Sequence, residues 1–406
     1  MLATCCACCA TSALAQGVYP GELSADGYKL PGGFQPVLQL RTYYFDAESL
    51  TGVRSEAWAI GGWAGARSPW WGNLFQVGLV GYTSQKLYGP VDEGGSKLLE
   101  PGQHSFSVIG EAYAALKVFD QTLAGYRQLV NRPFINPIDN RMVPNTFEGY
   151  TLTGSADNIS YTGGYLTKVK LRDLDSFQWM SDAAGGTGPQ RGVYYAGGTW
   201  DFVKNGNVRL DDQYGDDVFN TFYVDGKYPI AIDDKTRLTL GAQYIRQKSV
   251  GAAQIGAFST DAVGVQAAIA QGPFDAFAAY TQTSRGFDTQ NPYGDHPSYL
   301  YLMQIAFNGA GEKAWGVGGN IRFATLGVPG LSAGGVFAQG YDRINAGTGA
   351  AIGNRNELDV RVDYAFVKGT MLEGLVATAR YSLLHQDGSP QNAPQLRLYI
   401  NYAVRF

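Results

Sequence analysis

The sequence has few charged residues, only three histidines and no cysteine after residue 9. Asp, Glu, Lys and Arg make up 16% of its 406 residues, against the ~25% usual for soluble globular chains, and the net charge is −4. That balance excludes a globally basic surface for nucleic acid, so we expect no nucleic-acid partner. After residue 15 there is also no run of 18 apolar residues, which argues against a transmembrane helix.

Glycine and aromatic residues are abundant instead. The chain has 54 Gly, nearly twice the average usage of ~7%, but without the three-residue period of collagen. Hydrophobic residues at 45% and aromatic residues at 13% argue against disorder. A large, glycine- and tyrosine-rich chain with little charge therefore favours β-strands.

All four cysteines lie near the N-terminus, at Cys5, Cys6, Cys8 and Cys9. The uncharged segment 1–15 ends in Ala-Leu-Ala, which is typical of a signal-peptidase site. We expect a cleaved signal peptide over 1–15 whose basic start lies upstream, an N-terminal extension over 16–36 and one barrel over 37–406. A lipidated cysteine and a metal cluster are the alternatives, although adjacent thiols without histidine or carboxylate nearby make a poor zinc site.

The clearest periodicity is at the C-terminus. Apolar residues alternate there with mostly polar ones, at Leu396, Leu398, Ile400, Tyr402, Val404 and Phe406. Side chains alternate across a strand, so one face is apolar, and eleven residues match the ~9–11 that a tilted strand needs to cross a bilayer. The same pattern recurs at 159–171, 315–323, 357–366 and 375–383, and less cleanly at 106–118 and 238–244.

A soluble β-sandwich also alternates, but its strands are usually ~5–6 residues long, whereas these run to about ten. Aromatic residues often end the apolar faces, as membrane-interface girdles require. Since backbone groups in lipid must all be paired, we predict an all-β, closed transmembrane antiparallel β-barrel of about 18 strands. Sixteen strands are the alternative, because 253–279 alternates poorly; either number leaves a water-filled channel.

The polar faces of these strands predict a set of cations in the lumen: Arg41, Lys168, Lys170, Arg322, Arg361, Arg380, Arg397 and Arg405. They form either a basic ladder that attracts carboxylates or braces that pair with wall carboxylates. Arg361 lies between Asp359 and Asp363, which favours bracing, whereas Arg380 and Arg397 have no such neighbours. A one-residue bulge would reverse the face of any one of them.

Two polar segments between strands are candidates for loops that narrow the channel. Residues 131–144 are proline-rich and carry Arg132, Asp139 and Arg141. Residues 291–297 could place Tyr293 and Asp295 opposite the basic wall, where paired opposite charges orient dipolar solutes. A further acidic group at 211–217 is interpreted as a solvated loop, with calcium as the alternative.

Enzyme motifs are poorly supported. Gly330-Leu-Ser-Ala-Gly334 fits G-x-S-x-G, but a strand follows it where a nucleophile elbow needs a helix. His104, His296 and His385 are far apart in the sequence and are interpreted as surface histidines. We therefore predict no catalysis, no cofactor and no metal.

Four segments resemble the OprD family of outer-membrane substrate-selective porins: 38–45 (LQLRTYYF), 141–149 (RMVPNTFEG), 310–315 (AGEKAW) and 323–331 (FATLGVPGL). The resemblance extends over most of 36–406. It implies an eighteen-stranded barrel with inward-folded loops and a basic inner wall opposed by a few acidic groups. It also implies passive diffusion of small anionic or zwitterionic solutes, such as amino acids or organic acids.

The resemblance further implies the outer membrane of Gram-negative bacteria, with outer-membrane lipid, lipopolysaccharide and the barrel-assembly machinery as partners. Phe406 would then be the terminal assembly signal, and the protein a monomer or loose homotrimer. Three alternatives stay open: a general porin with weak charge preference, an outer-membrane barrel enzyme of lipase or protease type, and a structural or adhesive barrel.

Overall fold

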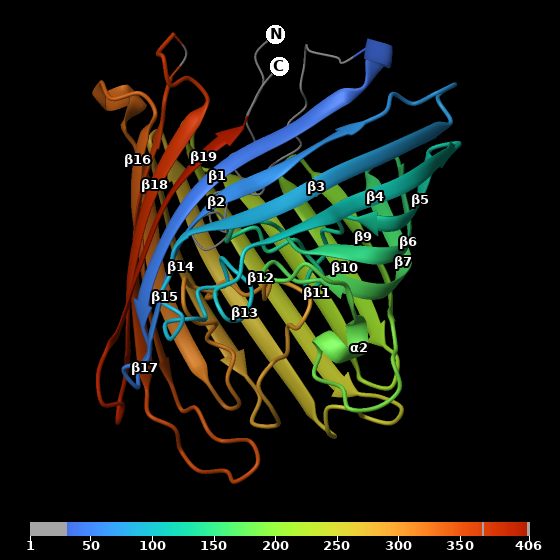
Figure 1. The fold of residues 1–406 in the computed structure, drawn as a ribbon. Helices are drawn as coiled ribbons and strands as arrows, with labels where there is room; N and C mark the ends of the chain where they lie inside the picture. Colours follow the sequence, from blue (N-terminus) through green and yellow to red (C-terminus); the bar gives the residue numbers. More distant parts are fainter. Residues whose placement is uncertain (1–30, 368, 404–406) are drawn as a thin grey trace.

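The computed structural model describes residues 31–367 and 369–403, so the expected signal peptide, Arg405 and Phe406 lie outside the described part. Within it, nineteen strands form one antiparallel sheet that closes into a barrel (Figure 1). One of them, β8 (Gln178–Trp179), is a two-residue segment inside a long connection. The other eighteen strands make the wall, which confirms eighteen over sixteen.

The wall strands are β1 (Gln35–Glu48), β2 (Arg54–Arg67), β3 (Phe75–Tyr88), β4 (Phe106–Val118), β5 (Gln121–Gln128), β6 (Thr146–Ala156), β7 (Ile159–Lys170), β9 (Val193–Val203), β10 (Gly206–Gly215), β11 (Phe219–Ala231), β12 (Thr236–Ser249), β13 (Ser259–Gln271), β14 (Phe274–Thr283), β15 (Lys313–Arg322), β16 (Leu331–Tyr341), β17 (Arg355–Ala365), β18 (Leu375–Gln386) and β19 (Ala393–Ala403). Short helical turns are η2 (Pro31–Gly33), α2 (Met180–Ala183) and η3 (Phe323–Leu326). No helix among the described residues is long and apolar enough to cross a membrane.

The first and last strands close the ring. Leu40 of β1 lies opposite Gly62 of β2 on one side and Tyr402 of β19 on the other. Every wall strand thus has two hydrogen-bonded neighbours, and no strand edge of the described wall is left open. Closure satisfies the backbone groups that a lipid environment cannot hydrogen-bond.

The segment 253–279, which alternates poorly, covers β13 and the first part of β14, which are joined by a tight turn at residues 272–273. Small residues lie opposite each other across this hairpin, such as Ala267 with Ala278 and Gly264 with Thr281. Alanine on both faces hides the alternation of hydrophobicity, although the strand geometry is regular. This explains why the sequence left the strand count open.

Strand faces follow the predicted alternation. On β17, Leu358, Val360 and Val362 point outward and are 44–46% exposed. Their neighbours Glu357 and Asp359 point into the barrel and are buried. An apolar outer surface around a polar interior is the arrangement of a bilayer-spanning barrel.

A substitution on the outer face tests whether this face contacts the bilayer. Changing Val360, at the middle of β17, to arginine should destabilise the folded barrel by about 2–4 kcal/mol in a bilayer, because the charge then lies near the membrane midplane. Urea titration of folding into phospholipid vesicles measures this cost. The lumen-facing change Ser332→Arg is the control, and equal costs for the two variants would contradict the assignment of faces.

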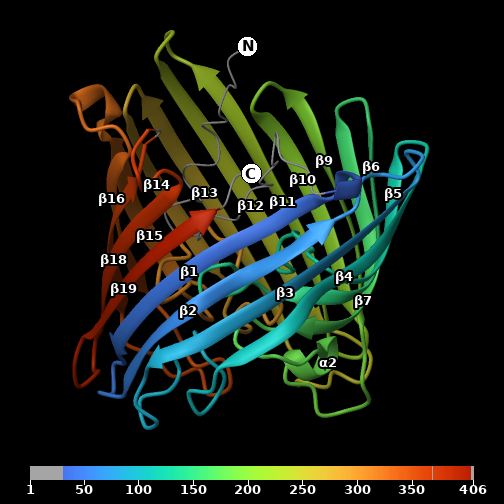
Figure 2. The same ribbon diagram turned by 45° about the horizontal axis from the view of Figure 1, so that its top comes forward.

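The two ends of the barrel differ. Two-residue turns at 119–120, 157–158, 204–205 and 272–273 lie at one end, where β1 also begins and β19 ends. The opposite end carries long connections at 89–105, 129–145, 171–192, 284–312 and 342–354. Figure 2 shows the strands tilted steeply between these ends, with several connections turning into the interior.

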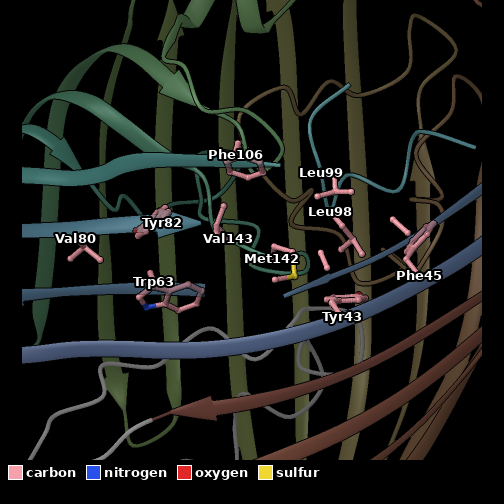
Figure 3. Packing of buried hydrophobic residues seen from close by; sticks show 12 residues of the cluster. Tyr43, Phe45, Trp63, Val80, Tyr82, Leu98, Leu99, Phe106, Met142 and Val143 are labelled. Atoms are coloured by element: carbon pink, nitrogen blue, oxygen red, sulfur yellow. The ribbon is translucent and has the colours of Figure 1, made fainter. Parts of the chain in front are cut away.

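An apolar cluster inside the barrel holds two of these connections against the wall (Figure 3). Tyr43 and Trp63 reach it from β1 and β2, Leu98 from connection 89–105, and Met142 and Val143 from connection 129–145. Leu98, Met142 and Val143 are completely buried. Hydrophobic burial therefore fixes long loops inside the barrel, as the predicted constriction loops require.

Candidate pore constriction

The connection between β5 and β6 (residues 129–145, called the first inward loop below) is anchored to β1 by a buried ion pair. Asp139 accepts hydrogen bonds of 2.7 and 3.1 Å from the Arg41 guanidinium, and both side chains are almost inaccessible to solvent. Arg41 also donates to Asn401 Oδ1 at 2.5 Å and to the carbonyl of Arg141. Arg41 thus braces the loop.

The other half of this loop reaches the far wall. Arg132 contacts Asp211 of β10 at 2.6 Å, and Gln213 donates to the carbonyl of Pro133. Phe134 packs edge-to-face against Tyr223 of β11. Since β1 and β10 are half a circumference apart in the ring of strands, the first inward loop spans the lumen.

The connection between β14 and β15 (residues 284–312, the second inward loop) is tied to the first. Ile135 and Tyr293 form a parallel β-bridge. Asn136 Oδ1 accepts a 2.8 Å hydrogen bond from the Asp295 amide, and Asn136 Nδ2 donates to the Asp295 carbonyl at 3.2 Å. A Cβ atom at Gly294 would lie 2.5 Å from Asn136 Oδ1, so only glycine permits this approach.

The tip of the second inward loop is held by wall side chains. Asp359 accepts from the Met303 amide at 2.9 Å, and Glu357 accepts from the Gln304 amide at 2.7 Å. Arg397 donates to the Met303 carbonyl at 2.6 Å. Both carboxylates therefore bind loop backbone.

Three arginines lie side by side on the inner wall. Arg361 of β17 is directly opposite Arg380 of β18, which is directly opposite Arg397 of β19. Arg361 makes a 2.6 Å ion pair with Asp363, and Arg380 and Arg397 are almost fully buried. Like charges directly opposite on a sheet destabilise it, so this row has a stability cost.

Two loop arginines extend the row into the lumen. Arg141 and Arg397 both lie over the Phe45 ring, at 4.9 and 5.9 Å from its centroid. Arg141 donates to the Ser96 carbonyl at 2.7 Å, and Arg172 donates to Asn140 Oδ1. Within the described residues, Arg141, Arg172 and Arg397 hydrogen-bond only to neutral acceptors. We call these three residues the arginine group.

The pKa values of two loop residues show the field of this group. Burial lowers the pKa of Arg141 well below its usual range, and the neighbouring charges of Arg397 and Arg172 lower it further. Burial raises the pKa of Asp295, while Arg172, the Tyr301 hydroxyl, Arg141 and Arg397 oppose that rise. The arginine group therefore creates a positive potential that a carboxylate relieves, and Asp295 lies within reach of it.

The remaining predicted cations have other surroundings. Arg322 is at the short-turn end and pairs with Asp275. Lys170 is completely buried, with its ammonium 5.5 Å from the centroid of the Tyr82 ring and bonded to the Leu171 carbonyl.

The prediction that Lys168 faces the lumen is wrong. An extra residue in β7 shifts its register against β6, so that Lys168 lies opposite Glu148 while Leu166 lies opposite Gly149. Lys168 consequently shares a face with Glu148, whereas Val169 and Phe147 point into the barrel and pack with Tyr293. The bulge thus reverses the face of Lys168.

Other interpretations also change. Asp211 and Asp212 belong to β10, and Asp211 is buried against Arg132, so 211–217 is only in part a loop. No group of three or more metal-ligating side chains occurs among the described residues. His296 is buried in the second inward loop, which corrects its interpretation as a surface histidine; His104 and His385 are exposed.

His296 gives a prediction about pH. Its Nε2 lies 2.5 Å from Thr289 Oγ1, and burial lowers its pKa from 6.5 to about 3. The His296 imidazole binds a proton below about pH 6.5 in the unfolded chain, but only below about pH 3 in the folded protein. Stability should therefore fall with decreasing pH, by about 2 kcal/mol between pH 7 and 5.

Urea titrations at several pH values measure this fall, and His296→Gln should remove it. The exposed His385→Gln is the matched control and should leave the fall in place. An unchanged pH dependence in His296→Gln would contradict the assignment.

Several residues of the constriction were missed from sequence. Arg172 and Tyr301 lie in long connections without periodicity, and the partner of Arg132 is 79 residues away. The nearest signal was the proline-rich composition of 131–144.

A closed barrel with an apolar outer face, a polar interior and two loops fastened across its lumen defines an outer-membrane diffusion channel. Comparison with known proteins supports this class. A model of the outer membrane porin OprD family matches residues 33–406. Porin D of Pseudomonas aeruginosa is 24% identical over 315 residues, which cover 73% of this chain and 71% of that protein.

Solved structures show the same fold. The chain superposes on OccK9 (OpdG) of Pseudomonas aeruginosa with a TM-score of 0.82 at 21% identity, over 93% of this chain and 100% of that one. For OpdK of the same species, solved with vanillate, the TM-score is 0.80 at 21% identity, over 91% and 98%. A BenF-like porin of Pseudomonas fluorescens gives 0.82 at 20% identity, over 91% and 98%.

The chain belongs to the OprD family of outer membrane porins. It is accordingly a channel of the bacterial outer membrane that passes small solutes, and not an enzyme. The short-turn end, with both ends of the described wall, is then the periplasmic end, and the long connections are extracellular.

Proposed function

We propose that this porin is selective for small carboxylates and zwitterions, such as organic acids and amino acids. The arginine group carries the proposal: three arginines at the constriction hydrogen-bond only to neutral acceptors among the described residues. A buried cation without an anion is unfavourable, and a passing carboxylate relieves that cost.

The arrangement favours weak binding. Arg141 and Arg397 are buried, so they act on a solute mainly through their electrostatic field, whereas Arg172 is partly exposed. A channel needs attraction that is strong enough to admit a solute and weak enough to release it. Asp295 on the second inward loop would attract the ammonium group of a zwitterion while the arginines attract its carboxylate.

Planar-bilayer recording of the refolded protein tests this function. We expect a small conductance that millimolar carboxylates block, and vanillate is a suitable first probe because OpdK was solved with it. Benzyl alcohol, a neutral aromatic control, should not block. A large ohmic conductance that no carboxylate or amino acid alters would favour a general porin instead.

We also propose the remaining expectations about maturation and assembly. Residues 1–15 are removed as a signal peptide, the terminal Phe406 directs the chain to the barrel-assembly machinery, and the barrel is a monomer or loose homotrimer among lipid and lipopolysaccharide. N-terminal sequencing of the membrane-extracted protein and its mass in detergent, measured by light scattering, decide the first and last of these.

A further inference from the structure

A pocket separate from the arginine group lies inside the barrel. It has a volume of about 270 Å³, opens to the lumen and is lined by the start of the first inward loop and by β6, β7 and β9. Its lining includes Asn131, Arg132, Thr151, Thr153, Ser160, Thr162 and Tyr195. The volume is several times the ~30 Å³ share of one water molecule, so a small organic solute fits.

The pocket lies on the periplasmic side of the constriction. Thr153 is near the periplasmic end of β6, and Ser160 is the second residue of β7, which starts at that end. Thr153 lies opposite Thr162, and Ser160 lies opposite both Ser155 and Thr199. A solute that has passed the first inward loop therefore meets this surface next.

Hydroxyl groups dominate the lining. Thr151 is already engaged, because its hydroxyl lies 2.7 Å from Gln128 Oε1. Among the described residues, Thr153 and Ser160 make no side-chain hydrogen bond, and both are accessible. Each hydroxyl can donate one hydrogen bond and accept two, so the pair offers several contacts to a solute.

The pocket is close to electrically neutral. Arg132 is the one charged side chain of its lining, and Asp211 holds it at 2.6 Å. A Cβ atom at Gly197 would lie 2.3 Å from Asp211 Oδ1, so this glycine leaves room for the carboxylate that neutralises Arg132. The surface thus differs from the constriction, where three arginines hydrogen-bond only to neutral acceptors among the described residues.

We propose that this pocket is a second solute site, which binds small polyhydroxylated solutes through the hydroxyls of Thr153 and Ser160. The proposal rests on the proposed function only in that solutes cross the constriction. Neutral hydroxyls exchange readily with water, so the site is weak and releases its solute toward the periplasm.

Xylitol, a neutral polyol, is the probe. It has no carboxylate, so the arginine group does not attract it. Thr153→Val and Ser160→Ala together should raise the xylitol concentration that half-blocks the current by about fivefold, since two modest hydrogen bonds are lost. Vanillate block should be unchanged. The matched control is Thr239→Val with Ser332→Ala, two hydroxyls on other parts of the lumen wall, which should leave xylitol block unaltered.

The conservative change Thr153→Ser keeps the hydroxyl and should keep the block, which separates hydrogen bonding from packing. Equal xylitol block in wild type and the double variant, or equal loss in the control variant, overturns the proposal. If vanillate blocks none of these proteins, the proposed carboxylate selectivity fails, while the xylitol comparison still decides the pocket.

Discussion

Replacing Arg380 and Arg397 by glutamine should weaken vanillate block of the channel by about tenfold, which corresponds to about 1.4 kcal/mol. The two charges lie directly opposite each other on β18 and β19. Each contributes on the order of 1 kcal/mol to the attraction of a carboxylate several ångströms away in a partly hydrated lumen. The half-blocking concentration in planar bilayers measures the effect.

Removing both charges also relieves like-charge repulsion in the wall. The double variant also loses the hydrogen bond from Arg397 to the Met303 carbonyl, so its stability is measured by urea titration and block is compared where both proteins are fully folded. Arg322→Gln, at the exposed ion pair with Asp275, is the matched control and should leave block unchanged. Unaltered block in the Arg380 and Arg397 variant would show that the row does not act on solutes.

Changing Asp139 to alanine should loosen the first inward loop and cost about 3–5 kcal/mol of folding free energy. The Arg41 guanidinium then stays buried without its carboxylate, the situation in which breaking a buried pair is most costly. The freed loop should also widen the channel, so single-channel conductance should rise and become noisier. Urea titration and bilayer recording measure the two effects.

A double-mutant cycle shows whether the pair acts as a unit. The cycle consists of Arg41→Met, Asp139→Leu and the two combined, and the combined variant should recover part of the stability that Asp139→Leu loses. Asp275→Asn, which breaks an ion pair with the more exposed Arg322, is the control and should cost less than about 1 kcal/mol. An Asp139 variant with wild-type stability and conductance would contradict the bracing role of Arg41.

The wall of the barrel could be predicted from sequence because a period of two is a local property. The pattern at 357–366 matches β17 (Arg355–Ala365), and that at 375–383 lies within β18 (Leu375–Gln386). The prediction for Lys168 is wrong because one extra residue in β7 reverses the face of this side chain. An insertion of this kind leaves no mark on the composition of the strand. Alternation therefore predicts faces reliably only between bulges.

The constriction was less predictable, because its contacts join distant segments. The sequence identified both inward loops, yet gave no sign that Asp139 would brace Arg41, 98 residues away, or that Asp359 would hold the Met303 amide. Such pairings depend on which wall each loop reaches, and the tilt and closure of the whole barrel decide that. Composition indicates a rigid polar loop but not its partners.

The pairing of β1 with β19 joins residues at the two extremes of the chain, such as Gln39 with Asn401, 362 positions apart. The barrel therefore cannot close until its last strand has been synthesised and delivered to the membrane. A chain truncated just before Ala393 would lack only β19, yet it would expose two strand edges at once, on β1 and on β18. Premature stop codons near the 3′ end of the gene should thus be as damaging as early ones.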